Sequence, residues 1–287
     1  MRSPRRKTIT AIAEGLPLVP IKLARDNRFS HLVEVIEPKR TRNQLILSAQ
    51  NIRTFLTLMD EYRGGDLLRR HGMQVRSKLL FCGPPGCGKS LTAEVFANEL
   101  ALPLIVARLD AIISSFLGET ATNIRKVFET AAHQPCVLFL DEFDALARAR
   151  ADGSEHNELR RVVNSLLMLI DRFSGKGFLI AATNLEASLD SAVWRRFDDV
   201  VFFDMPSARE IRKLCQLKTR NFPPSFPFSE KLSPLNGMSY ADVERVCDNA
   251  IKRSILRGSK YLLETEFNNA IREQQRRQAI KERLRSL

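Results

Sequence analysis

Short apolar runs alternate with segments of helical periodicity between residues 78 and 204, and this alternation constrains the fold more than any other feature of the chain. The runs are apolar on both faces, as strands inside a parallel sheet are. They are Lys78–Cys82, Leu104–Ala107, Cys136–Leu140, Gly177–Ala182 and Val200–Asp204. Strands that alternate with helices predict an α/β fold, in which helices cover both faces of a parallel five-stranded sheet.

Helical patterns occupy most of the remaining chain. Those before and between the predicted strands are Leu45–Leu68, Ser90–Leu100, Thr120–Ala132, Leu159–Arg172 and a short segment near Ala187–Trp194. After Met205 we find no strand signal. Ser239 followed by Asp242 predicts the N-cap of a helix that ends at Gly258.

We expect three parts in the chain. The first 45 residues have weak periodicity and four prolines, which is typical of an arm or linker. Residues 46–205 form the predicted α/β domain. Residues 206–287, which read as helices broken by turn-forming residues, form a small helical lid.

A phosphate-binding loop is predicted directly after the first of the five strands. Residues 83–90, GPPGCGKS, match the pattern G-x-x-x-x-G-K-[ST], with a strand before them and a helix after them. Glycines let backbone N–H groups approach phosphate oxygens, and a helix N-terminus favours an anion. We expect Lys89 to bridge the β- and γ-phosphates of a nucleotide, and Ser90 to bind Mg²⁺. A plain Gly/Pro turn is the alternative. The expected nucleotide-binding residues of this segment are Gly83, Pro84, Pro85, Gly86, Cys87, Gly88, Lys89, Ser90 and Leu91.

Adjacent carboxylates follow the third predicted strand, in CVLFLDEFD. Asp141 comes at the carboxyl end of that strand, where open α/β sheets bind their ligands. We expect Asp141 to hold Mg²⁺, directly or through water, and Glu142 to polarise an attacking water molecule. The alternative is that these acidic residues cap the next helix, and Asp144 fits that alternative.

With these two motifs in this order, the chain resembles the AAA family of ATPases and is expected to have the αβα sandwich of a P-loop NTPase. The stretch AATN, which ends the fourth predicted strand, extends the resemblance. Asn184 stands where this family keeps a polar sensor of the γ-phosphate. Since an amide beside Asp141 can orient the attacking water, the physical argument agrees. Termination of a strand is the alternative role of Asn184.

A pair of arginines lies in the segment LDSAVWRRFD. In the AAA family this region carries arginine fingers that reach the ATP of a neighbouring subunit. Arg195 and Arg196 match by position, and their adjacency resembles the katanin-like and meiotic branches. The resemblance therefore implies a homo-oligomer, usually a ring of six. The alternative is a surface salt bridge with Asp198 or Asp199.

Two further parts of the resemblance concern the substrate and the purine base. In ISSFLGET, Phe116 and Leu117 stand in the family's pore loop, where an aromatic residue grips an extended polypeptide; burial of Phe116 in a core is the alternative. The base is expected between Gly72 with its neighbours and the lid. The lid contributes Ser239-Tyr240-Ala241-Asp242 there, in which Tyr240 replaces the family's glycine.

Charge and cysteine content restrict the partners and the compartment. The chain has a formal charge of +12, and residues 1–45 and 251–287 each carry ten basic and four acidic residues. Such basic ends can bind nucleic acid, an anionic membrane surface or an acidic protein. The alternative is that they are solvated and bind no partner. Five scattered cysteines without CxxC spacing exclude a zinc site of that type, and no apolar run is long enough to span a membrane. We expect a cytoplasmic protein.

The sequence therefore predicts an ATP- and Mg²⁺-dependent hydrolase that remodels, unfolds or threads a protein. Any degradation would need a separately encoded effector such as a protease, because HExxH and GxSxG motifs are absent from the sequence. The alternative is a nucleotide-switched oligomeric scaffold that binds nucleic acid through its basic ends and controls a partner effector.

Overall fold

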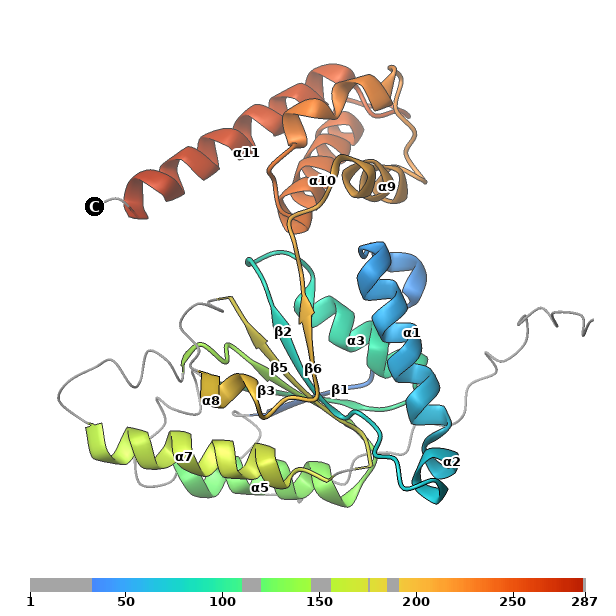
Figure 1. Ribbon diagram of the computed structural model, residues 1–287. Coiled ribbons are helices and arrows are strands. Elements are labelled where there is room, and N and C mark those ends of the chain that lie inside the picture. Colours follow the sequence, from blue (N-terminus) through green and yellow to red (C-terminus); the bar gives the residue numbers. More distant parts are fainter. Residues whose placement is uncertain (1–32, 110–119, 146–155, 175, 185–190, 286–287) are drawn as a thin grey trace, which may run out of the picture.

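The fold is an α/β sandwich followed by a group of helices, as predicted (Figure 1). The computed structural model describes residues 33–109, 120–145, 156–174, 176–184 and 191–285. One sheet holds six strands in the order β1-β3-β4-β5-β2-β6, and helices cover both of its faces. Among the described residues, no helix has the length and apolar character that a membrane crossing requires.

All five predicted strands are present, with their ends shifted by at most two residues. They are β2 (Lys78–Cys82), β3 (Leu104–Arg108), β4 (Val137–Asp141), β5 (Phe178–Thr183) and β6 (Asp199–Phe202). They pair in parallel. Because parallel strands end at one edge of the sheet, the segments that follow β2, β4 and β5 meet there.

The sheet has a sixth strand that the prediction of five missed. β1 (Val33–Ile36) pairs with β3 in antiparallel register, with Val33 opposite Ala107 and Ile36 opposite Leu104. It lies in the segment interpreted as an arm or linker. Only four residues form it, and Glu34 and Val35 are exposed, so the local sequence carries little strand signal. Its conformation is stabilised by pairing with β3, a long-range effect that periodicity does not report.

Helices α1 (Ala49–Arg63) and α3 (Lys89–Glu99) cover one face of the sheet. A cluster of aromatic rings joins them to it, with Phe55 packed on Phe81 and Phe96. The predicted Leu45–Leu68 helix is divided, because α1 ends at Gly64 and a short second helix, α2 (Gly65–Arg70), follows.

The opposite face of the sheet is covered by α5 (Thr120–His133), α7 (His156–Arg172) and the short α8 (Ser191–Trp194). The core beneath them is largely aliphatic, and Leu166, Ile170 and Ala131 are fully buried in it. The sheet is thus buried on both faces, which explains why its central strands read as continuous apolar runs.

The C-terminal helices, here called the lid, pack around a core of their own. They are α9 (Ala208–Lys218), α10 (Tyr240–Leu256) and α11 (Glu264–Arg285), with α10 packed against both of the others. Phe267 and Val246 lie at the centre of this core. The predicted N-cap is confirmed, because the Ser239 side chain accepts a hydrogen bond from the Asp242 backbone N–H. The lid stands over the carboxyl ends of the strands (Figure 1).

Candidate functional site

The loop after β2 folds into a phosphate cradle. Gly83 has φ +138° and Gly86 has φ +78°, conformations that side chains rarely tolerate. A Cβ on Gly83 would lie 2.1 Å from the carbonyl oxygen of Phe203, and one on Gly86 would lie 2.7 Å from Ser239 Oγ. The loop therefore approaches other backbone closely, while α3 begins at Lys89 and directs its N-terminus at the cradle.

Lys89 lies inside this cradle and is almost fully buried. Its Nζ donates to the carbonyl oxygen of Gly83 at 2.6 Å and of Pro84 at 3.0 Å, and to Oδ1 of Asn184 at 2.7 Å. An ammonium held by three oxygens, one of them from the residue that follows the neighbouring strand β5, is placed to exchange them for phosphate oxygens.

Oxygen ligands suited to Mg²⁺ stand beside the cradle. Ser90 Oγ donates to Asp141 Oδ2 at 3.4 Å, and both residues line one cavity. Within the described segments, no group of three or more His, Cys, Asp or Glu side chains is arranged to hold a metal by itself. This fits a Mg²⁺ ion that takes one protein carboxylate, one hydroxyl and phosphate oxygens.

Glu142 follows Asp141 in a left-handed conformation, with φ +55°. Such a conformation is uncommon for a residue with a side chain and is often retained where a site requires it. The backbone supports it, because the N–H of Glu142 donates to Asp141 Oδ1 and the N–H of Phe143 donates to Ala182. The turn thus aims the Glu142 side chain into the same cavity as Asp141.

Asn184 lies beside Asp141, as the strand order predicted. β4 and β5 are neighbours, and both residues line the cavity. The buried Asp144 accepts a hydrogen bond of 3.4 Å from the Asn184 backbone N–H. Asp144, which the sequence suggested only as a helix cap, therefore links the carboxylate loop to the predicted sensor. No sequence signal distinguished that role.

The cavity has a volume of about 610 Å³, enough for a nucleotide. It is lined by the cradle, Asp141, Glu142 and Asn184. It is also lined by Ile36, which ends β1, by Arg40, and by Tyr240 and Ala241 of the lid. Ile36 and Arg40 were missed from the sequence, because only the pairing of β1 brings them to the cradle.

The resemblance implies that Gly72 lies near the base. It lies in the turn after α2, where its N–H donates to the carbonyl of Arg69, and it is not among the residues that line the cavity. The physical reason is topological, because Gly72 precedes β2 and so belongs to the amino-end edge of the sheet, opposite the cradle.

The lid touches the cradle directly. The N–H of Ala241 donates to the carbonyl of Gly86 at 3.1 Å, so the tyrosine that replaces the family's glycine does not hold the lid away. Tyr240 packs against the core beneath α3 and the core of the lid. Burial and the neighbouring Glu210 carboxylate raise the pKa of its hydroxyl.

Asp242 connects this contact to the last helix. Its carboxylate accepts from Ser239 Oγ at 2.8 Å and from Gln274 Nε2 at 2.7 Å, and it pairs with Arg245. Since Gln274 belongs to α11, a short series of hydrogen bonds joins α11 to the phosphate loop.

The two arginines after α8 lie outside the cavity of their own chain. Neither Arg195 nor Arg196 is among the described residues that line it. Arg196 Nε pairs with Asp171 at 3.2 Å, and Arg195 is exposed. Asp198 and Asp199, which the sequence suggested as alternative partners of these arginines, bind other residues.

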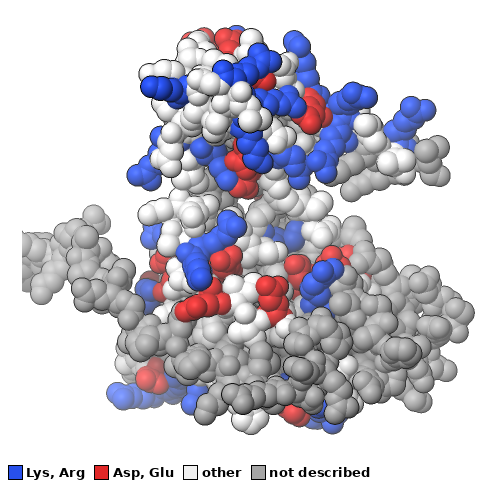
Figure 2. Space-filling model, turned by 180° about the vertical axis from the view of Figure 1, so that it is seen from behind, with Lys and Arg blue, Asp and Glu red and all other residues white. Residues whose placement is uncertain are grey.

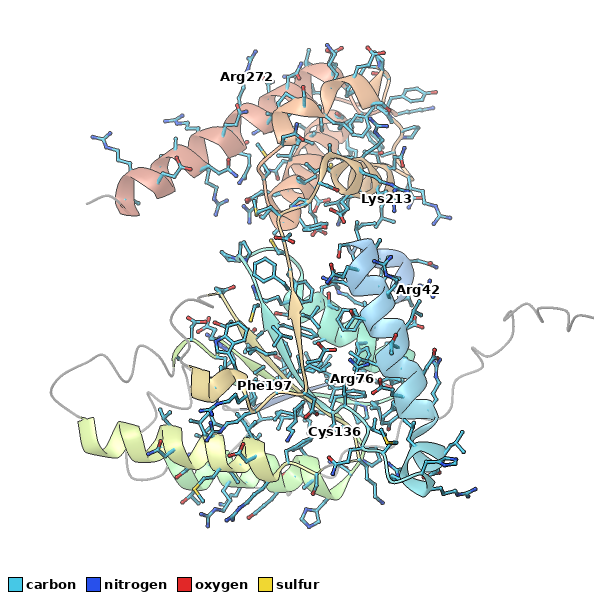
Figure 3. The ribbon with its side chains drawn as sticks, in the orientation of Figure 1. Arg42, Arg76, Cys136, Phe197, Lys213 and Arg272 are labelled. Atoms are coloured by element: carbon cyan, nitrogen blue, oxygen red, sulfur yellow. The ribbon has the colours of Figure 1, made fainter. Side chains whose placement is uncertain are left out.

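Those partners stabilise the opposite end of the sheet. Asp198 accepts backbone N–H bonds from Ser77 and Lys78, both at 2.9 Å, and Asp199 pairs with Arg76. Figure 3 shows Arg76 and Phe197 at this end of the domain. Asp198 and Asp199 therefore each bind other residues, and Arg196 pairs with Asp171.

Two groups of predicted residues need separate mention. Phe116 and Leu117 lie outside the described residues. Cys87, in the loop itself, is buried and its Sγ contacts Met205 Sδ at 3.8 Å. Burial raises the pKa of the Cys87 thiol.

Comparison with known proteins gives two matches. Residues 79–205 match the model of the family described as "ATPase family associated with various cellular activities (AAA)". The chain is 56% identical over 279 residues to the uncharacterized AAA family ATPase y4kL of Sinorhizobium fredii (strain NBRC 101917 / NGR234). That alignment covers 97% of this chain and 83% of the relative.

Proposed function

This chain belongs to the AAA family of ATPases and is a P-loop ATPase, and from that premise we propose that it works as a ring, six subunits in our interpretation, that remodels, unfolds or threads a protein. The observation that carries the proposal is the separation of Arg195 and Arg196 from the cavity of their own chain. A site that holds the phosphates in one chain and lacks its fingers there is completed by a neighbour.

Residues of this chain perform most of the chemistry at the phosphates. Lys89 neutralises charge on the β- and γ-phosphates, leaving its present partners Gly83, Pro84 and Asn184. Glu142 accepts a proton from the attacking water, and Asn184 fixes that water by hydrogen bonding. The Asp144 carboxylate positions the Asn184 backbone by accepting a hydrogen bond from its N–H.

Ser90 and Asp141 are the residues that would hold Mg²⁺. When bound, the ion supplies charge neutralisation at the β- and γ-phosphate oxygens. Ile36, Arg40 and Tyr240 also line the cavity, and we place the base against them. The exposed Arg195 is our choice of the finger that enters the next subunit.

The lid couples this chemistry to movement. Ala241 is bonded to Gly86, and Asp242 is bonded to α11, so a change in the phosphate loop is transmitted to the whole lid. Tilting of the lid against the α/β domain would displace the pore loop, for which Phe116 and Leu117 remain our prediction. The output is force on a polypeptide, used directly or by a separate effector such as a protease.

Mixing two inactive variants tests whether the fingers act in trans. Glu142→Gln removes the base of its own site, and Arg195→Ala removes the finger given to a neighbour. In mixed rings, an Arg195→Ala subunit that receives the finger of a Glu142→Gln neighbour has one complete site. We expect ATP turnover to rise above that of either variant alone. The control is the Glu142→Gln protein alone, at the same total protein concentration. No recovery on mixing, with oligomers present by light scattering, would contradict the proposal.

Phe116→Ala tests the remodelling output separately. We expect basal turnover to be retained while unfolding of a bound protein substrate, followed by loss of fluorescence from a fused reporter, is abolished. Leu56→Ala, an exposed apolar change on α1, is the matched control. If turnover is slow, unaffected by protein and stimulated by nucleic acid, the scaffold alternative replaces the motor.

A further inference from the structure

We propose that the outer face of α11 and the adjoining end of α10 form a binding surface for the phosphate backbone of single-stranded nucleic acid. We call this the lid basic surface and define it as Lys252, Lys260, Arg272, Arg276 and Arg277. It is separate from the nucleotide cavity, and it goes beyond the protein-remodelling function proposed above.

The first observation is that the five cations of this surface have no partners among the described residues. All five side chains are exposed, and none forms an ion pair or hydrogen bond with a residue in the described part of the chain. Other cations of the lid are occupied: Lys231 pairs with Glu264, Arg253 with Glu273, and Arg257 with Glu266. These pairs engage three of the four acidic residues in 251–287, so those three carboxylates do not neutralise the lid basic surface.

The second observation is the arrangement of these charges. Arg272 and Arg276 are four residues apart on α11, so they share a helix face and are separated by about 6 Å along its axis. Arg277, also exposed, lies next to Arg276 in sequence and about 100° further around the helix, so it adds a cation at the flank of this row. Figure 2 shows many Lys and Arg side chains over the lid and along α11, with fewer Asp and Glu side chains among them. A linear polyanion can meet such a row in succession.

An exposed aromatic ring completes the surface. Tyr261, 55% exposed, follows Lys260 in the turn that leads into α11. Its backbone is held in place by Ser259 Oγ, which accepts from the Tyr261 N–H at 3.0 Å. Cations beside an aromatic ring on which a base can stack are typical of proteins that bind single strands.

The apolar faces of the same helices argue against a membrane. A helix that lies on a bilayer needs an apolar face to insert. In α11 the apolar residues Phe267, Ala270 and Ile271 are buried in the lid core, and the exposed Ile280 and Leu284 are confined to its C-terminal end. The exposed Ile255 and Leu256 occupy a single turn at the end of α10 and offer no helix-long apolar face.

The test measures binding of labelled single-stranded oligonucleotides, about 20 nucleotides long, to the full chain by fluorescence anisotropy over a range of salt. The variant Arg272→Gln/Arg276→Gln/Arg277→Gln removes three cations from the surface. We expect its affinity to fall by roughly tenfold or more, and the slope of log affinity against log salt to decrease by about 2.

The matched control removes the same charge from the opposite edge of the lid. Arg209→Gln/Arg212→Gln/Lys213→Gln changes exposed residues of α9, and Figure 3 shows Lys213 far from Arg272. We expect its affinity to stay within about twofold of the unchanged protein. ATP binding, measured in parallel, shows that both variants are folded.

Three results would overturn the proposal. These are equal losses in the α9 and α11 variants, absence of oligonucleotide binding by the unchanged protein, and binding only to phosphatidylserine vesicles or to poly-glutamate. Failure of ATP-driven remodelling would leave it standing, because neither the surface nor its test depends on turnover.

Discussion

The two halves of the ATPase site differ in how complete they are within one chain. In the phosphate half, Lys89 is held by three oxygen atoms, and Asp141 and Glu142 are fixed by backbone hydrogen bonds in the same turn. In the finger half, Arg195 and Arg196 lie outside the cavity, with Arg196 paired to Asp171. On the function proposed above, this difference means that one chain binds the nucleotide before it assembles, whereas turnover requires a second copy.

The largest expected effect separates the two arginines of the finger half. A finger in related nucleotide hydrolases contributes about 10³–10⁵ in rate. We expect Arg195→Ala to lower kcat by roughly 10³ or more with ATP affinity unchanged, because the side chain acts only in the neighbouring site. Arg196→Ala should lower kcat much less, since Arg196 is paired within its own chain.

Asp171→Asn is the control for this comparison. It removes the partner of Arg196 and leaves Arg195 untouched. If Arg196 were the principal finger, freeing it would change kcat and Arg195→Ala would be mild. Steady-state turnover at saturating ATP, with nucleotide affinity from a fluorescent ATP analogue, distinguishes the two cases.

The arrangement of the phosphate half could be predicted because each of its segments is local in sequence. GPPGCGKS and its flanking strand and helix are contiguous, and Asp141 and Asn184 end two strands that the α/β pattern places side by side. The five strands and the Ser239 cap were predicted for the same reason, since apolar runs and capping residues act within a few positions.

What was missed depends on contacts distant in sequence. β1 is a strand only because it pairs with β3, and with it Ile36 and Arg40 reach the cavity. Asp144 serves Asn184, forty positions away. Gly72 is a different case, because it precedes the predicted strand Lys78–Cys82 and the α/β topology alone places it at the amino-end edge of the sheet.

The next largest effect concerns Lys89 in the phosphate half. Lys89→Ala removes the buried cation that faces the phosphates, at a cost of roughly 2–5 kcal/mol in binding. ATP affinity should fall by about 30- to 5,000-fold. Since this half is complete in one chain, the loss should be the same at protein concentrations below and above assembly.

Lys231→Ala is the matched control, because Lys231 is paired with Glu264 on the surface of the lid. Its ATP affinity, from isothermal titration, should equal that of the unchanged chain. A Lys89→Ala protein that binds ATP normally would show that the phosphate half had been misassigned.

The smallest effect lies at the weakest link of the phosphate half, the 3.4 Å hydrogen bond from the Asn184 N–H to Asp144. Asp144→Asn weakens it, and a hydrogen bond to a charged group contributes about 1.5–3 kcal/mol. We expect kcat to fall by roughly tenfold while KM for ATP stays the same, because Asn184 orients the water and the cradle holds the phosphates.

Asp198→Asn is the control that separates positioning from stability. Asp198 accepts two backbone N–H bonds of 2.9 Å at the opposite end of the sheet. It should lower Tm without lowering kcat, whereas Asp144→Asn should lower kcat beyond what any change in Tm explains. If the two variants show the same changes in Tm and kcat, Asp144 has a structural role only. Asn184 would then orient the water without help from Asp144.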